Sequence, residues 1–450
     1  MNSRRKSRHR PSWCDPLRDK AVLSWAMYDW ANSAYTTLLI TVLVAYIQRV
    51  VFPVEQWGYT GAVVWAWGIS LSMFLGAVLS PLVGAIADAR ASKRRWLAAT
   101  ALSGAVASIL LGIVPPQMYV VIVILFVMAN LMLELSLGIY NGFLPEIVDE
   151  KQINSASSWG YGLGYLGGGI ALLIAMMILQ FGHLLGIETM SARLRCSLVL
   201  MGIWWGIFSL PAIVVLRDQP NKHAEQRSIR DAIRHSFGDV LQTLRSLRVN
   251  VPLALFLVGF LFYNDGVQTI ISQASTFALQ ELSFPEAELM AVILMIQFLA
   301  LPGALVIGKC ADWFGQKRTL LATLAVWIGV LVAALFIASK IGFWGMAVVV
   351  AFVLGGTQSV SRSLMATMTP MGESAKYFGF FNLSGKATSF LGTFLFGLIV
   401  ATSGSSRLAI FGLLPLFVIG MGLLWMMKDG HVDEAPRSPR NAKSLKDAVP

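Results

Sequence analysis

Gly84-Ala-Ile-Ala-Asp88 and Gly308-Lys-Cys-Ala-Asp312 are two copies of one short stretch, 224 positions apart. Other positions repeat at an offset of 225, and these are Pro145 with Pro370, Gly160 with Gly385, Leu166 with Leu391, and Gly167 with Gly392. Near-constant spacing at three separate places indicates that the chain contains two copies of one structural unit.

The composition identifies the environment in which these units fold. Of the 450 residues, 56% are hydrophobic and 13% are charged, whereas a soluble domain has about 25% charged residues. This excludes a water-soluble enzyme. Apolar runs long enough to cross a bilayer as helices occur at 22–48, 60–87, 96–114, 118–144, 156–181, 196–216, 250–279, 287–308, 319–339, 342–361, 377–402 and 408–427. The runs are continuous rather than alternating, which argues against a β-barrel.

The runs and the duplication together predict an all-α membrane protein of twelve transmembrane helices in two pseudo-symmetric six-helix bundles. Duplicated units of this kind are typical of transporters whose halves rock about a central site. We expect five regions: a basic cytoplasmic arm at 1–21, bundles at 22–216 and 250–427, a cytoplasmic linker at 217–249 and a cytoplasmic tail at 428–450. The linker has helical spacing of apolar and basic residues, which predicts an amphipathic helix on the inner leaflet.

The positive charges predict the orientation, because Lys and Arg are retained on the cytoplasmic side. They gather in the N-terminal arm and in the loop that holds Lys93-Arg94-Arg95, whereas the alternate loops hold few. Both termini are therefore expected in the cytoplasm, with the chain in a bacterial inner (plasma) membrane. The net charge of +11 follows this alternation, so we expect no nucleic-acid partner.

Several motifs that suggest chemistry have better structural explanations. Gly162-Leu-Gly164-Tyr-Leu-Gly167 matches a dinucleotide-binding pattern, but it lies inside an apolar run and lacks the preceding strand. Glycines at 160, 164 and 168 instead favour close helix packing. The three cysteines are far apart and indicate neither a disulfide framework nor a metal site. We expect no catalytic residue, cofactor or metal.

Four charged residues lie inside the predicted spans, where an ionisable group is costly and faces a cavity, a partner or a pathway. They are Asp29, Glu134, Asp265 and Lys386. We expect them to line a central cavity, with Asp29 and Asp265 contacting protons or a substrate amine and Lys386 a substrate carboxylate. Orienting hydrogen bonds are expected from Tyr28, Asn32, Asn264 and Gln268. The alternative is a static salt bridge of Lys386 with Asp265 or Glu134.

A cytoplasmic gate is predicted at the repeated stretch. Asp88 and Asp312 each end an even-numbered span and precede basic residues that include Arg94 and Arg318. Each carboxylate can pair with these residues or with the positive N-terminal end of a neighbouring helix. A solvated loop charge is the alternative.

The repeated stretch also resembles the loop motif of the major facilitator superfamily, Gly-x-Leu-Ala-Asp-Arg-x-Gly-Arg-Lys-Arg. The second copy keeps Gly308, Asp312, Gly315, Lys317 and Arg318, whereas the first copy has Ala89 and Ala91 in place of Arg and Gly. The chain further resembles the vacuole-effluxer-like branch, also called the unknown major facilitator family. That resemblance rests on Tyr28 to Ser33, Tyr140 to Glu146, Gly164 to Gly168, Tyr263 to Gly266, and Ser361-Arg362-Ser363 with Ser384-Gly385-Lys386.

The resemblance implies secondary transport, and the best-known member of the family exports amino acids from a degradative vacuole. We therefore expect a monomeric carrier that exports a small, amino-acid-like solute by alternating access, with protons as the coupling ion. Two alternatives stay open: a membrane-embedded transferase acting on lipid-linked substrates, and a carrier fold that serves as a sensor without transporting. The five histidines form no cluster in the sequence, which argues against the transferase.

Overall fold

The computed structural model describes residues 13–58, 60–218, 238, 240–243, 245, 250–370, 372–386 and 389–428. Within them, twelve helices are long and apolar enough to cross a membrane. The predicted twelve-span, all-α fold is confirmed. The predicted basic arm up to residue 12, almost all of the amphipathic linker helix, and the tail from residue 429 lie outside the described residues.

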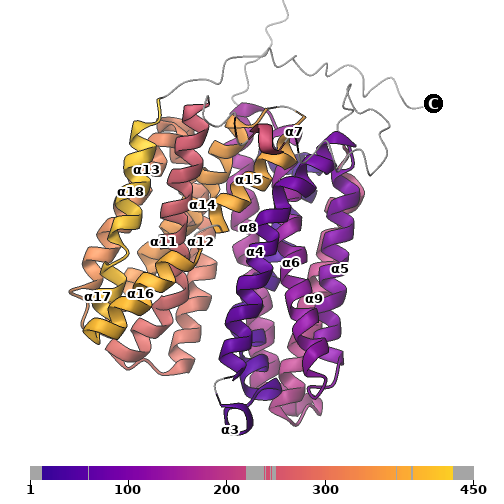
Figure 1. Ribbon diagram of the computed structural model, residues 1–450, viewed down its shortest axis with the longest axis vertical. Coiled ribbons are helices and arrows are strands. Elements are labelled where there is room, and N and C mark those ends of the chain that lie inside the picture. The colour runs from indigo at the N-terminus through magenta and orange to yellow at the C-terminus, as the bar shows by residue number, and fades with distance from the viewer. Residues whose placement is uncertain are drawn as a thin grey trace, which may run out of the picture.

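The two halves lie side by side, with α7 at one end of the molecule and α3 at the other (Figure 1). In the N-terminal half, the first span is continuous from α1 (Lys20–Leu38) through η2 (Leu39–Leu43) and α2 (Val44–Tyr46) to η3 (Ile47–Val51). It is followed by α3 (Val54–Trp57), α4 (Thr60–Ala89), α5 (Lys93–Ile113), α6 (Tyr119–Gly142), α7 (Leu144–Ile147), α8 (Ile153–Phe181) and α9 (Met190–Val215). Short 3-10 turns lie at η1 (Asp15–Arg18), η4 (Glu150–Gln152) and η5 (Gly182–Leu185).

The C-terminal half repeats this plan. Its helices are α11 (Val251–Leu282), α12 (Glu286–Phe314), α13 (Gln316–Ala334), α14 (Lys340–Met368), α15 (Ser374–Lys386), α16 (Ser389–Ser403), α17 (Ser406–Phe411) and α18 (Leu414–Met426). One span differs from its predicted bounds in a way that matters for function. We expected the tenth span to end at residue 361, but α14 continues to Met368 and so carries Arg362 inside it.

The glycine face predicted at 160, 164 and 168 packs against α1, as expected. A Cβ atom on Gly164 would lie 2.8 Å from Ser33 Oγ, and one on Gly168 would lie 2.6 Å from Thr37 Oγ1. Such distances are too short for a side chain, so only glycine lets α8 approach α1 this closely. The C-terminal half has the same kind of close packing at a glycine, because a Cβ on Gly392 of α16 would lie 2.1 Å from Thr269 Oγ1 of α11.

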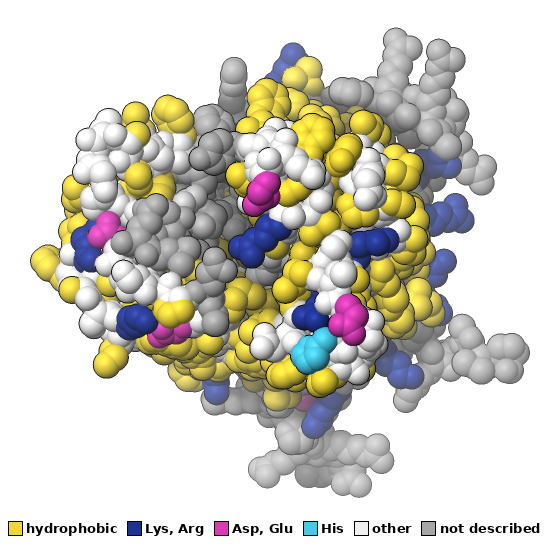
Figure 2. Space-filling view, turned by 90° about the horizontal axis from the view of Figure 1, so that it is seen from below, with side chains coloured by type: hydrophobic (Ala, Val, Ile, Leu, Met, Phe, Trp, Pro, Cys, Tyr) yellow, Lys and Arg dark blue, Asp and Glu magenta, His cyan; other side chains and the backbone are white. Residues whose placement is uncertain are grey.

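The outer surface of the helices is apolar. Large hydrophobic side chains that are well exposed include Trp67, Phe74, Val120, Val214, Phe336 and Trp425. Seen from the α3 end, hydrophobic side chains cover much of the described surface, and charged side chains are few (Figure 2). A helix that is apolar on its outer face as well as its inner face suits a bilayer, where lipid replaces water around the protein.

The halves meet along two seams, one where α8 packs on α12 and α14, and another where α15 packs on α4 and α6. The second seam is tight near α7: a Cβ on Gly84 would lie 2.3 Å from the carbonyl oxygen of Ala375. Polar groups placed on these seams are therefore shielded from water and need partners from the opposite half.

Candidate functional site

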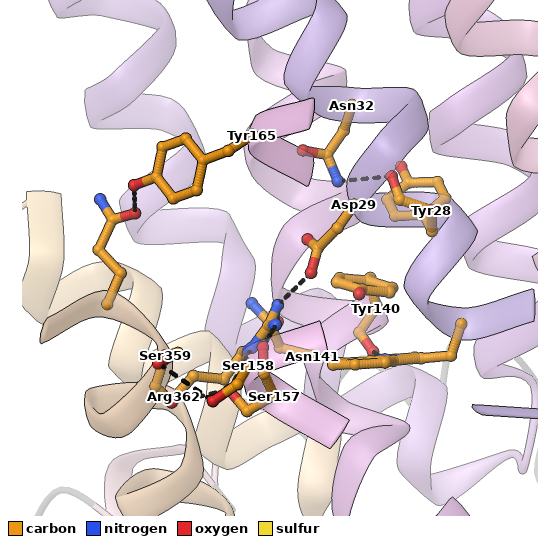
Figure 3. A network of polar contacts seen from close by, with 12 residues as sticks. Tyr28, Asp29, Asn32, Tyr140, Asn141, Ser157, Ser158, Tyr165, Ser359 and Arg362 are labelled. Atoms are coloured by element: carbon orange, nitrogen blue, oxygen red, sulfur yellow. Dashed lines mark hydrogen bonds and ion pairs between the residues drawn. The ribbon is translucent and has the colours of Figure 1, made fainter. Parts of the chain in front are cut away.

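The first polar cluster joins Asp29 of α1 to Arg362 of α14, across the boundary between the halves (Figure 3). Arg362 Nη1 lies 2.7 Å from Asp29 Oδ2, and both side chains are buried. The guanidinium also donates to Ser157 Oγ at 3.0 Å, to the Ser157 carbonyl at 2.7 Å and to Asn141 Oδ1 at 3.3 Å. Every one of these acceptors belongs to the N-terminal half. Arg362 therefore connects the C-terminal half to α1, α6 and α8 of the N-terminal half.

Aromatic rings surround the same guanidinium. Its central carbon lies 4.0 Å from the ring centroid of Tyr161, 4.6 Å from that of Trp25 and 5.9 Å from that of Tyr140. Trp25 and Tyr140 stack with centroids 4.8 Å apart, and the Trp25 indole donates to the Tyr140 carbonyl. Ring faces within about 6 Å of a cation attract it electrostatically. Arg362 is thus held by a carboxylate and by an aromatic enclosure.

The second polar cluster is an ion pair between Glu134 of α6 and Lys386 of α15, at 3.2 Å. It also crosses the boundary between the halves. The Glu134 side chain is buried, whereas 20% of the Lys386 side chain is exposed. Asn382, one turn before Lys386, donates to the Glu134 carbonyl at 2.8 Å. From the sequence, either Glu134 or Asp265 could be the salt-bridge partner of Lys386.

Asp265 and Asn264 form hydrogen bonds within their own half. Asp265 Oδ2 accepts a hydrogen bond of 2.9 Å from the backbone N–H of Gly392, in the first turn of α16. Asp265 Oδ1 is buried and has no hydrogen-bond partner among the described residues. Asn264 donates to the carbonyl of Gly385, near the end of α15, at 2.9 Å. The two side chains therefore hold the segment where α15 ends and α16 begins.

The other predicted orienting residues do not converge on one point. Asn32 donates to the carbonyl of Tyr28 on its own helix, at 2.8 Å. The Tyr28 ring packs on Tyr140 with centroids 4.8 Å apart. Gln268 lies on α11, partly exposed, one turn beyond Asp265. That Asp29 and Asp265 line one central cavity, with these side chains supplying orienting hydrogen bonds, stays a prediction.

Asp88, which we predicted to be part of a gate, lies at the α7 end and binds the opposite half. Its carboxylate accepts from the backbone N–H groups of Ala375 at 3.2 Å and of Lys376 at 2.8 Å, in the first turn of α15. Its basic partner is Lys93, at 3.4 Å, and not Arg94. Lys93 also pairs with Glu146 of α7, and Ser374 of α15 accepts from Lys93 and donates to Glu146. A carboxylate at a helix N-terminus is stabilised by the helix dipole.

Asp312, the second residue of the predicted gate, has no basic partner among the contacts of the described residues. It accepts from the indole of Trp13 at 2.6 Å and from Asn154 of α8 at 2.8 Å. Arg318 is exposed at the start of α13. Of the partners expected for Asp312, Arg318 makes no such contact among the described residues, and the N-terminal segment and α8 bind the carboxylate.

Arg94 also differs from the expectation, since its side chain is exposed while its backbone N–H donates to Asp218 at 3.1 Å. Burial raises the pKa of the Asp218 carboxyl, which the hydrogen bond from Arg94 partly opposes. Arg94 thus binds the segment that follows α9 through its backbone N–H and not through its side-chain charge.

Comparison with known proteins decides the family. The family model described as vacuole effluxer Atg22 like matches residues 48–434. This chain belongs to that Atg22-like family. The resemblance drawn from the sequence is confirmed, and with it the assignment to transporters of the major facilitator type.

Relatives of the Atg22-like chain occur in bacteria and fungi. It is 30% identical over 412 residues to an uncharacterized MFS-type transporter, YxiO of Bacillus subtilis, covering 89% of this chain and 93% of that protein. It is 29% identical over 301 residues to autophagy-related protein 22 of Yarrowia lipolytica, covering 60% of this chain and half of that protein. The first of these relatives is named as a transporter, and neither name indicates a catalytic family.

Solved structures agree on the fold of the Atg22-like chain. FucP, a major facilitator transporter in its outward conformation, superposes with a TM-score of 0.69 at 14% identity, over 91% of this chain and 99% of its own. The proton:xylose symporter XylE gives 0.70 at 11% identity, over 92% and 96% of the two chains. At such identities the likeness concerns the fold alone.

Arg362 was not among the intramembrane charges predicted for this Atg22-like chain. The predicted span ended at 361, just before Arg362, whereas α14 continues to Met368. Lys93 and Glu146 were missed for a related reason, since both lie at span ends where charges are ordinary. The motif Ser361-Arg362-Ser363, which is part of the family resemblance, was the available signal.

Proposed function

We propose that this chain exports a small, amino-acid-like solute by alternating access, coupled to protons. It would do so as a monomer in a bacterial plasma membrane, with both termini and the α7 end in the cytoplasm. Membership of a transporter family supports the class of function. The name of that family, an effluxer, favours export.

The Glu134–Lys386 ion pair is the observation that carries the proposal. It joins the two halves within the membrane-spanning part of the molecule, and Lys386 is partly exposed. Removing one member of a buried pair costs about 3–5 kcal/mol, because the other charge is left uncompensated. Such a pair therefore opens readily only when something replaces the lost partner.

A solute and a proton can make that replacement together. The carboxylate of the solute binds the Lys386 ammonium in place of Glu134, and Glu134 takes up a proton and becomes neutral. Asn382 already bonds the backbone of Glu134 and can keep the helix in position while the side chain changes partner. When the proton leaves, Glu134 binds Lys386 again and the solute is released. Solute and proton therefore cross in the same direction, and export follows the outward gradient of the solute.

Proteoliposomes test the proposal when they are incubated with pooled labelled amino acids and other metabolites, with and without an imposed pH gradient. We expect accumulation of one class of solute carrying a carboxylate only when the gradient is present. Glu134→Gln should abolish the effect of the gradient but leave exchange of solute, because Lys386 stays charged. Lys386→Gln should abolish both.

A matched control is the exposed pair of Lys340 and Glu288, at 2.8 Å between α14 and α12. Glu288→Gln removes one charge of a comparable ion pair within a single half, and we expect transport to be unchanged. Absence of flux for every solute class would favour the sensor alternative, whereas turnover of a lipid-linked substrate would favour the transferase.

A further inference from the structure

We propose that Asp29, Trp25, Tyr140 and Tyr161 form a binding site for the organic cation of the transported solute, and that Arg362 fills this site when the α7 end is closed. We call these four residues the cation enclosure. The inference rests on the proposed function for its role in transport, but its binding chemistry stands on the geometry alone.

The cation enclosure belongs entirely to one half. Asp29 and Trp25 lie on α1, Tyr140 on α6 and Tyr161 on α8, and these helices pack together in the N-terminal bundle. Arg362, in contrast, comes from α14 of the other half. When the halves separate at the α7 end, the enclosure stays together and the guanidinium leaves it.

Separation leaves a buried carboxylate that has lost its counter-ion. Asp29 is 5% exposed in the closed form, and an unpaired charge in such surroundings is strongly unfavourable. A cation from the solute removes this penalty in the open form only, because Arg362 blocks the site in the closed form. A ligand that binds one state better than the other shifts the equilibrium toward that state.

The acceptors around the guanidinium indicate which cation fits. Besides Asp29, the hydroxyl and carbonyl oxygens of Ser157 and the side-chain oxygen of Asn141 accept its N–H groups. A cation with N–H donors, such as a guanidinium or a primary ammonium, bonds the carboxylate and neutral oxygens of this set together with the ring faces. A quaternary ammonium ion satisfies the rings and the charge but leaves the neutral acceptors unbonded, so it should bind more weakly.

Chemical replacement of the missing side chain tests the site directly. In purified full-length Arg362→Ala protein, methylguanidinium should raise the Tm in a saturable manner, because a ligand that binds only the folded state stabilises it. We expect methylammonium to act similarly and tetramethylammonium more weakly, and the neutral molecule tert-butanol should have no effect. Wild-type protein should respond little, since Arg362 already fills the site.

Further variants distinguish binding of methylguanidinium in the cation enclosure from a general stabilisation of the protein by salt. Adding Asp29→Asn to Arg362→Ala should weaken methylguanidinium binding by roughly tenfold or more, given the cost of losing a buried charge partner. Tyr161→Ala should weaken it too, whereas Tyr161→Phe keeps the ring face and should bind nearly as well. Equal shifts with and without the Asp29 carboxylate would overturn the proposal.

A transport measurement with wild-type protein keeps the proposal testable if Arg362→Ala does not fold. Methylguanidinium should inhibit solute flux from the side that the α7 end faces and much less from the opposite side. Inhibition of equal strength from both sides would contradict a site that opens only at the α7 end. If no solute is transported at all, the proposed function fails, but the binding of methylguanidinium by Arg362→Ala still decides whether the cation enclosure exists.

Discussion

Asp88 and Asp312 occupy equivalent positions in the two halves but bind unlike partners. Asp88 binds two backbone N–H groups in the first turn of α15 and the ammonium of Lys93. Asp312 binds two side chains, the indole of Trp13 and the amide of Asn154. Asp88 is buried and Asp312 is exposed. The repeat has thus kept the carboxylates while their contacts have diverged.

Asp88→Asn is expected to loosen the closed α7 end. An amide oxygen can still accept one N–H group, but a charge-assisted hydrogen bond contributes about 1 kcal/mol more than a neutral one. With two such bonds and the Lys93 pair affected, the open state should gain roughly tenfold in population. Spin labels on Arg95 and Arg318, both exposed and on opposite halves, would report a longer distance in the variant.

The corresponding change in the other half is the control for this experiment. Asp312→Asn keeps an acceptor for Trp13 and Asn154 at an exposed position, where charge contributes little. We expect the spin-label distances to change much less than in Asp88→Asn. Equal shifts in the two variants would show that the two carboxylates still act as a symmetric pair.

Trp13→Phe is expected to weaken the link between the N-terminal segment and the C-terminal half. The Trp13 carbonyl accepts from Ser155 and Trp159 of α8, and these bonds do not depend on the indole. The variant loses only the hydrogen bond to Asp312, worth about 1 kcal/mol, so the open state should rise about fivefold. Trp313→Phe, at a well exposed tryptophan on α12, should leave the spin-label distances unchanged.

Gly160→Ala is expected to disrupt the ion pair of Asp29 and Arg362. The added Cβ would lie 2.6 Å from both Arg362 Nη2 and Asp29 Oδ2, and overpacking of this kind costs about 1–3 kcal/mol. Thermal unfolding in detergent should show a lower Tm, and transport should fall. Gly162→Ala adds the same methyl group two residues away, where its nearest neighbour is Leu301 at 3.4 Å. That variant should be as stable as the wild type, since alanine favours helix.

The sequence predicts the twelve spans and the glycine face because both depend on local patterns, namely the length of apolar runs and the spacing of small residues. It also identifies Asp29, Glu134, Asp265 and Lys386 as charges within spans, since a membrane makes any such charge conspicuous. Pairing is different. Whether Lys386 meets Glu134 or Asp265 depends on how the two bundles dock, and that docking leaves no periodic signal in the chain.

The ends of spans set a second limit. Charged residues are ordinary there, so Lys93, Glu146 and Arg362 do not stand out from the loop charges around them. Their burial results from the close approach of α15 to α4 and of α14 to α8, which is a property of the assembled halves. For the same reason Trp13, which precedes the first span, could not be assigned to Asp312 in advance.

Asp265→Asn is expected to show whether Asp265 couples transport to protons or only supports the start of α16. The amide oxygen of the substituted side chain can still accept the N–H of Gly392, so the start of α16 keeps its support, whereas the negative charge is lost. If Asp265 takes part in proton transfer, the variant should lose accumulation driven by a pH gradient and keep part of its solute exchange. Asp265→Ala removes both the charge and the acceptor. The unsatisfied N–H of Gly392 should lower the free energy of unfolding by about 1–3 kcal/mol, and the Tm should fall with it. Uptake by Asp265→Asn that responds to pH as the wild type does would remove Asp265 from the coupling mechanism and leave it the role of bracing α16.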